Sequence, residues 1–285
     1  MYDTPRGQTP NSEPISFAEI LSRPHRVETL AQVEAPDGTV LAWGISLAGG
    51  EVTVDSTAQF RRKCSLDLVP YGGSGIVGDD LELDAAALDS LRESLIPERA
   101  GDPTSPYGNL VRVWRGIMVP GMPSYWYGPQ DDFYRWQLGL FRLSSADVQD
   151  DGVPSLRIEG YDRSRTISRN KLVDPWIVLA GTNWGDAIVA LVQDRDPTAP
   201  ARAHLVSEVT AGDVIVDPEQ DPWEVVTEWA KAIGCEVFFD NEGYLVIREE
   251  PDLATSPIVW EYSDGTVGAN AVILGVGRTM TDEPG

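Results

Sequence analysis

Histidine is a common general base, and the chain contains two, His25 and His204. A Ser-His-Asp or Cys-His site needs one of them held against a nucleophile. His25 follows Pro24 at the start of an expected strand, and His204 lies in the polar segment PARAHLVSEV. The sequence has no HExxH pattern, CxxC pair or nucleophile elbow. We therefore predict no catalytic residue and interpret both histidines as surface or strand-end side chains, with a base role as the alternative.

Cysteines and glycines give no sign of a metal or cofactor. Cys64 and Cys235 are far apart in apolar, strand-like surroundings, which is typical of small buried thiols and predicts neither a disulfide framework nor a zinc site. Residues 73–78 match the pattern GxGxxG, but no βαβ unit surrounds them. Asp79 and Asp80 follow at once and would repel a pyrophosphate. We predict a loop there, and no cofactor and no metal anywhere.

The segment Tyr125, Trp126 and Tyr127 is the candidate interface, because Tyr and Trp are favoured anchors where proteins meet. A loop folded onto its own domain is the equal alternative. Carboxylate pairs could form a glycosidase site, with aromatic rings stacking on sugar. Among 45 acidic residues, however, such pairs arise by chance. The short acidic runs also lack the twelve-residue calcium-loop pattern, so we read them as turns.

Net charge excludes several classes of partner. With 45 acidic and 22 basic side chains, the chain carries −23. Phosphate binding needs the opposite sign, so we predict no specific nucleic-acid binding, and anionic membranes would also repel the chain. No apolar stretch approaches the ~20 residues of a membrane span, and the first residues lack a secretory core. We expect a soluble protein made in the cytoplasm, whose acidity keeps copies apart.

The elements that must position these residues are mostly strands. Twenty-seven glycines and 21 prolines favour many turns. Alternating patterns predict strands at 25–35, 39–47, 51–55, 60–69, 109–119, 134–149 and 155–164. Asp37-Gly38 predicts a hairpin and Gly49-Gly50 a second turn. Successive antiparallel strands of this kind indicate a sandwich or a barrel.

Two strand faces can be assigned from the alternation. In the strand at 60–69, the inward residues are expected to be Phe60, Cys64, Leu66 and Leu68. In the strand at 134–149, they are expected to be Trp136, Leu138 and Leu140. A short helix is expected at 85–95, between these groups of strands.

After about residue 165 the apolar period changes to that of helices. One helix is predicted at 184–194 and a stronger one at 221–234. The second has Asp221 as N-cap, Pro222 in its first turn and Gly234 at its end. Its buried stripe is expected to be Trp223, Val226, Trp229, Ala230 and Ile233. A strand, an Asn-Glu-Gly turn and a second strand follow and complete a helix–hairpin unit.

These patterns predict an α+β chain that is mainly β. We expect a mobile N-terminal arm at 1–24, an antiparallel β-barrel domain at 25–165 and a smaller α/β domain at 166–256. Residues 257–285 are expected to form strands of a second barrel, incomplete within this sequence.

The order of segments resembles minor tail proteins of siphophages that infect actinobacteria. It runs through VTVDSTAQFRRKCSLDLVP, SPYGNLVRVWRGI, WQLGLFRLSSADV, LRIEGYDRSRTISRNKL, WGDAIVALV and DPWEVVTEWAKAIGCEVFFDNEGYLVIREEPD. Those proteins look like the baseplate-hub family of contractile phages and related injection machines. The resemblance implies barrel domains forming a ring, usually a trimer, with α/β decoration and no enzymatic residues. It also implies that sequence after residue 285 completes the second barrel.

The function implied is that of a structural subunit of a phage tail tip. Its ring would link the tail tube to distal tip proteins and allow DNA passage, so the partners would be copies of itself and neighbouring tail proteins. The expected location is the virion tail tip, after assembly in the host cytoplasm. An acidic channel wall would repel DNA and let it slide. The alternative is a carbohydrate-binding or cell-wall-cleaving module of the same tail tip, which needs a groove of carboxylates and aromatic rings.

Overall fold

The computed structural model describes residues 26–68, 95–118, 134–150 and 154–251. Several expectations lie outside this part of the chain. They concern the N-terminal arm with His25, the glycine-rich loop at 73–78, most of the helix at 85–95, the candidate interface Tyr125, Trp126 and Tyr127, and the strands after residue 257.

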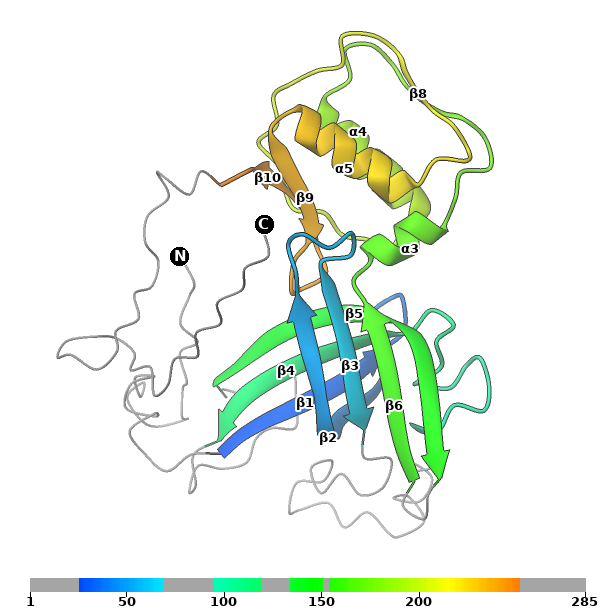
Figure 1. The fold of residues 1–285 in the computed structure, drawn as a ribbon, viewed down its shortest axis with the longest axis vertical. Helices are drawn as coiled ribbons and strands as arrows, with labels where there is room; N and C mark the ends of the chain where they lie inside the picture. The colour runs from blue at the N-terminus through cyan, green and yellow to red at the C-terminus, as the bar shows by residue number, and fades with distance from the viewer. Residues whose placement is uncertain (1–25, 69–94, 119–133, 151–153, 252–285) are drawn as a thin grey trace, which may run out of the picture. The chain divides into compact units, whose positions relative to one another are not determined.

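Six strands from the first half of the chain pair with one another. They are β1 (Arg26–Glu34), β2 (Val40–Val54), β3 (Arg62–Leu68), β4 (Leu110–Met118), β5 (Tyr134–Asp150) and β6 (Pro154–Tyr161). All pairs are antiparallel and follow the order β1-β2-β3-β6-β5-β4. Because β4 also pairs with β1, the six strands form a closed barrel (Figure 1). The prediction of a mainly β, antiparallel architecture is confirmed.

Alternate side chains of these strands fill the barrel. Cys64, Leu66 and Leu68 of β3 are at most 3% exposed, as their spacing predicts. They pack against apolar residues of every other strand, among them Val33, Ile45, Val111, Phe141 and Ile158. Phe60 does not join them: it precedes β3 and packs against a second core, formed by residues after 165.

The two predicted turns near the start have different outcomes. Gly38 has a φ of 87°, and the amide of Ala35 donates to the carbonyl of Thr39, so the Asp37-Gly38 turn is confirmed. The turn at Gly49-Gly50 is wrong, because β2 runs through both glycines. A Cβ on Gly50 would lie 2.5 Å from the carbonyl oxygen of Ser65. These glycines therefore let β3 approach closely at a register shift within the strand.

A bulge in β5 overturns the predicted inward face of that strand. Pairing with β4 passes from Trp114–Gln137 to Val113–Gly139, which leaves Leu138 as an extra residue. A one-residue bulge exchanges the two faces of a strand beyond it. Phe141 and Leu143 therefore fill the barrel, and Leu138 packs only partly against its core. The expected single face of Trp136, Leu138 and Leu140 is wrong.

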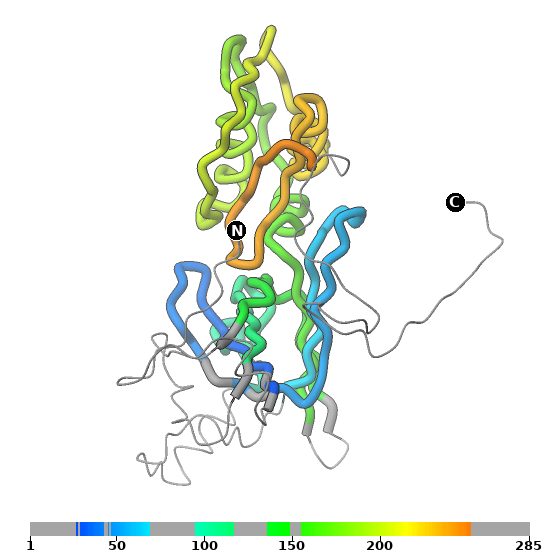
Figure 2. Tube along the Cα trace, turned by 90° about the vertical axis from the view of Figure 1, so that its left-hand side faces the viewer, coloured from blue at the N-terminus to red at the C-terminus, as the bar shows by residue number. Residues whose placement is uncertain are grey.

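The residues after 163 form three helices and four strands in the described part of the chain. They are α3 (Ser164–Arg169), β7 (Trp176–Val178), α4 (Trp184–Arg195), β8 (Val214–Val216), α5 (Pro222–Ala232), β9 (Cys235–Phe239) and β10 (Leu245–Glu249). They run from green to orange in Figure 2. β7 pairs with β8 and β9 with β10. The two predicted helices and the strand pair after them are confirmed, whereas α3, β7 and β8 are too short to show a period.

Local capping explains where the two long helices begin. The side chain of Asn183 accepts hydrogen bonds from the amides of Gly185 and Asp186 at the start of α4. Asp221 accepts from the amide of Trp223 at 2.9 Å, and Pro222 occupies the first position of α5. Such side-chain caps satisfy amides that have no partner within a helix.

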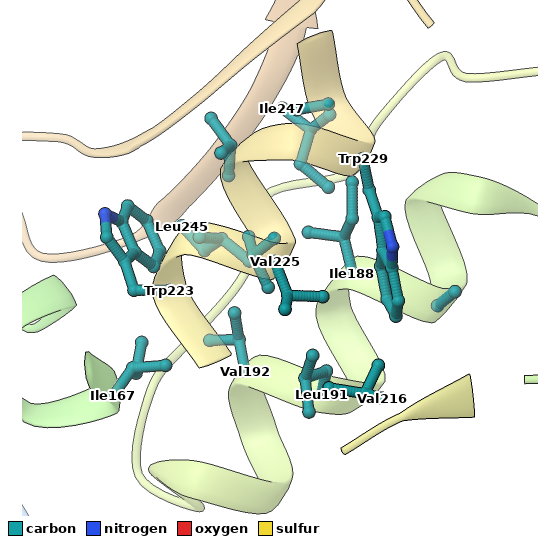
Figure 3. Packing of buried hydrophobic residues seen from close by; sticks show 14 of the residues in the cluster. Ile167, Ile188, Leu191, Val192, Val216, Trp223, Val225, Trp229, Leu245 and Ile247 are labelled. Carbon is teal, nitrogen blue, oxygen red and sulfur yellow. The ribbon is translucent and has the colours of Figure 1, made fainter. Parts of the chain in front are cut away.

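Helices α4 and α5 share one hydrophobic core with β9 and β10. Figure 3 shows its centre, with Ile188, Leu191 and Val192 of α4 facing Val225 and Trp229 of α5. Leu245 and Ile247 of β10 cover the other side. The predicted stripe of α5 is confirmed at Trp223, Val226, Trp229 and Ala230, and Ile233 is partly buried.

Candidate functional site

Among the described residues, His204 has a carboxylate partner but no nucleophile beside it. Its Nε2 lies 3.2 Å from Oδ1 of Asp186, and in the described part of the chain no serine, threonine or cysteine side chain bonds the ring. The ring packs on the first turn of α4, where a Cβ on Gly185 would lie 2.5 Å from it. Its Nδ1 is buried without a hydrogen-bond partner among the described residues. This geometry suits packing better than proton transfer to a substrate.

The thiols are also unsuited to chemistry. Neither Cys64 nor Cys235 forms a disulfide, and both are buried. Burial raises the pKa of the Cys64 thiol to about 12, so its thiolate is scarce at neutral pH. Within the described ranges, no group of three or more His, Cys, Asp and Glu residues is placed to hold a metal ion.

One face of the β7–β8 ribbon carries exposed apolar side chains. Ile177 and Ile215 are direct cross-strand partners, and they are 58% and 61% exposed. Val178 and Val216, on the opposite face, are buried in the α/β core. Leu179 follows two residues after Ile177 and is 64% exposed. We call Ile177, Leu179 and Ile215 the β7–β8 outer face.

This outer face was not predicted from the sequence. The strands WIV and VIV have three residues each, and every residue in them is apolar. No alternation therefore tells which side chains are buried. Ile177 and Ile215 lie 38 positions apart in the sequence, and only the fold pairs them.

A second feature is the junction between the barrel and the α/β residues. Leu140 points away from the barrel and is buried, and a Cβ on Gly243 would lie 2.6 Å from its Cδ2. Beside it, Gln137 donates through Nε2 to the carbonyl of Asn241 at 2.5 Å. The Nδ2 of Asn241 donates back to the carbonyl of Gln137 at 3.1 Å. The turn between β9 and β10 is thus bonded to β5.

A half-buried carboxylate strengthens the same junction. Glu236 on β9 accepts from Arg61, just before β3, at 2.7 Å and from Arg248 on β10 at 2.6 Å. Burial pushes the pKa of Glu236 upward, but the hydrogen bonds and charges of the two arginines outweigh it and hold the pKa below its ordinary value.

A third feature is a hollow of about 1130 Å³ between the barrel wall and the β9–β10 turn. Trp114 and Trp136 line it together with Glu51 and Glu242. Aromatic rings and carboxylates are the groups that a carbohydrate site needs.

The predicted interface residues Tyr125, Trp126 and Tyr127 lie outside the described residues, so that interface stays a prediction. Among the helices that the structure describes, none has the length and apolar character needed to cross a bilayer.

Comparison with known proteins gives likenesses of fold only. No protein-family model matches the chain, and no curated protein matches it. Among solved structures, a 43 kDa tail protein of prophage MuSo2 from Shewanella oneidensis has 9% identity and a TM-score of 0.45, over 77% of this chain and 52% of that one. A tail protein from Neisseria meningitidis MC58 has 12% identity and a TM-score of 0.46, over 83% and 56%.

A third likeness is to the Francisella PdpA-VgrG complex, with 10% identity and a TM-score of 0.47, over 80% of this chain and 32% of that one. The chain spans about half the length of the two tail proteins that it matches. It is similar in structure to phage tail and VgrG-type proteins.

Proposed function

We propose that the chain is a structural subunit of a phage tail tip, of the baseplate-hub type, and that it acts by assembly and not by catalysis. The order of sequence segments supports this proposal, as does the mainly antiparallel β architecture. The observation that carries it is the β7–β8 outer face. A cross-strand isoleucine pair left in water is typical of a surface that another protein covers.

The partner proposed for this face is another copy of the chain. Burying apolar surface stabilises an interface by about 25 cal/mol per Å². Within the described residues, β7 and β8 pair only with each other, so each also offers an unpaired strand edge. A face that is apolar and has open edges can bind through side chains and backbone together. Repeating one such contact with rotation closes a ring, for which we propose three copies.

In the proposed tail tip, the barrel domain at 25–165 forms the wall of the ring and the α/β domain at 166–256 decorates it. Neighbouring tail-tube and tip proteins are the other partners in this proposal. The net charge of −23 suits a channel through which DNA passes without sticking. The subunit assembles in the host cytoplasm and resides in the virion.

Substitution on the outer face tests the proposal. Ile177→Asp and Ile215→Asp place carboxylates where the copies would meet, so the assembled form should dissociate while the monomer stays folded. Leu205→Asp is the matched control, because Leu205 is 99% exposed and lies off this face. Size-exclusion chromatography with light scattering gives the masses. If Ile177→Asp and Leu205→Asp assemble equally well, the outer face is not the interface.

The predicted aromatic interface adds a second contact in this proposal. Truncating one buried aromatic anchor costs more than about 2 kcal/mol at an interface. Trp126→Ala should therefore weaken binding to a copy or to a neighbouring tail protein. Unchanged assembly would remove Tyr125, Trp126 and Tyr127 from the interface.

The hollow lined by Trp114 and Trp136 favours one alternative function, a carbohydrate-binding or cell-wall-cleaving module. If a sugar stacks on the ring of Trp136, Trp136→Ala should abolish binding of the chain to insoluble peptidoglycan. Release of reducing sugar that disappears in Glu51→Gln or Glu242→Gln would establish cleavage. If the chain neither binds peptidoglycan nor releases reducing sugar, the carbohydrate alternative is excluded and the structural role remains.

A further inference from the structure

Four arginines converge on one groove, although the chain as a whole is strongly acidic. The groove has a volume of about 560 Å³ and lies where β5, α3 and the end of α4 meet. Arg142 comes from β5, Arg165 and Arg169 from α3, and Arg195 from the last turn of α4. Only 22 of the 285 residues are basic, so this concentration of positive charge is a local feature.

Three of the four arginines form no ion pair among the described residues, although the charge of Glu159 acts on Arg165. Arg195 bonds the carboxylate of Asp194, whereas Arg142, Arg165 and Arg169 form no ion pair there. The guanidinium of Arg165 stacks on the ring of Tyr161 at 3.8 Å, which fixes its plane. Burial, and then the nearby charge of Arg169, lower the pKa of Arg165.

The acidic residues of the groove are already occupied. Asp196 pairs with the buried Arg163 at 2.8 Å and also accepts from Thr198. Asp162 accepts from the amide of Arg62 at 2.9 Å and from Ser164. Burial raises the pKa of Asp162, which favours its neutral form. The positive charge of the three unpaired arginines is therefore not matched by free carboxylates of the groove.

We propose that this groove binds an acidic peptide segment of a neighbouring protein, with carboxylates on Arg142, Arg165 and Arg169. The planar guanidinium of arginine can donate to both oxygens of a carboxylate at once. Pro36, Pro106 and Pro197 also line the groove and provide apolar contact for aliphatic side chains. The segment that fits has acidic and aliphatic residues in alternation. This inference does not depend on the ring proposed above.

A nucleic acid fits the groove less well than such a peptide. Two aspartates line the groove. The net charge of −23 also repels an approaching polyphosphate. A short peptide carries fewer charges and brings side chains for the proline-lined wall.

Fluorescence anisotropy with the full chain and a labelled hexapeptide of alternating Glu and Leu tests the proposal. Binding should be saturable and should weaken with added salt. Arg142→Ala and Arg169→Ala should each weaken it about tenfold, the value of one lost charge-assisted contact. Arg115→Ala, an exposed arginine on β4 outside this groove, should leave it unchanged. Circular dichroism confirms that each variant is folded.

Three results would overturn the proposal. The first is no binding of the Glu-Leu peptide at millimolar concentration. The second is equal binding of a Gln-Leu peptide, which would show that charge plays no part. The third is that a single-stranded oligothymidylate binds more tightly than the Glu-Leu peptide and loses its affinity in Arg142→Ala, because the groove would then be a phosphate site.

Discussion

Trp223→Ala is the substitution whose effect follows most fully from the structure. The side chain is 4% exposed, and its ring stacks on Phe239 with centroids 5.7 Å apart and planes at 26°. Its Nε1 donates to the carbonyl of Gln59 at 3.1 Å. Trp223 therefore joins α5 to β9 in the α/β core and to the loop before β3.

The expected loss can be divided between these contacts. Emptying a buried aromatic site costs about 3–5 kcal/mol. The hydrogen bond adds about 1 kcal/mol or less, because Gln59 is exposed and water replaces the lost donor. We expect a destabilisation of about 4 kcal/mol for Trp223→Ala. Trp223→Phe keeps one ring on Phe239, so it should cost about 1–2 kcal/mol.

Urea unfolding followed by circular dichroism measures the effect, since α4 and α5 are the longest described helices. Tyr107→Ala is the control: Tyr107 is 79% exposed, and its truncation should change stability by less than about 0.5 kcal/mol. A decrease in the free energy of unfolding below about 1 kcal/mol for Trp223→Ala would refute the reasoning, because removing a core aromatic side chain costs more than that.

Three further predictions concern buried and half-buried polar groups. Arg163→Met leaves the carboxylate of Asp196 buried and unpaired, which should cost about 3–5 kcal/mol in urea unfolding, and adding Asp196→Leu should recover most of it. The fold holds the pKa of Glu236 below its ordinary value, so the stability that this carboxylate contributes is present above the ordinary pKa of a glutamate and is lost as the pH falls through the lowered pKa. Glu236→Gln should therefore flatten the acid limb of stability measured by thermal unfolding, and an unchanged limb would contradict the junction geometry. Iodoacetamide at pH 8 should not alkylate Cys64 until urea is added, and fast labelling of the folded chain would show that the thiol is accessible.

Local signals in the sequence predict the helical elements well. Asp221, Pro222 and Gly234 mark the ends of α5, and the spacing of Trp223 and Trp229 identifies its buried face. These signals act within a few residues, so they need no knowledge of tertiary contacts.

The barrel shows where such reasoning fails. Alternation identifies Cys64, Leu66 and Leu68 as inward residues, because β3 is regular where they lie. The bulge at Leu138 depends on pairing with β4, which lies more than twenty residues earlier in the sequence. No local sequence pattern indicates it. Leu140 therefore looks like a barrel residue in the sequence but packs on Gly243.

The candidate surfaces are the least predictable part, because their residues come together only in the fold. Ile177 and Ile215 belong to separate three-residue strands, and the groove takes Arg142, Arg169 and Arg195 from three elements. In the sequence each of these is an ordinary isolated residue. At His204 the fold forms a His–Asp pair, and no nucleophile among the described residues joins it.

The mass of the chain in solution tests the central claim most directly. Sedimentation equilibrium over a wide concentration range should give a species of three times the 31.1 kDa chain mass that dissociates in Ile177→Asp. A single 31.1 kDa species at every concentration, together with turnover of a cell-wall polysaccharide, would contradict the account.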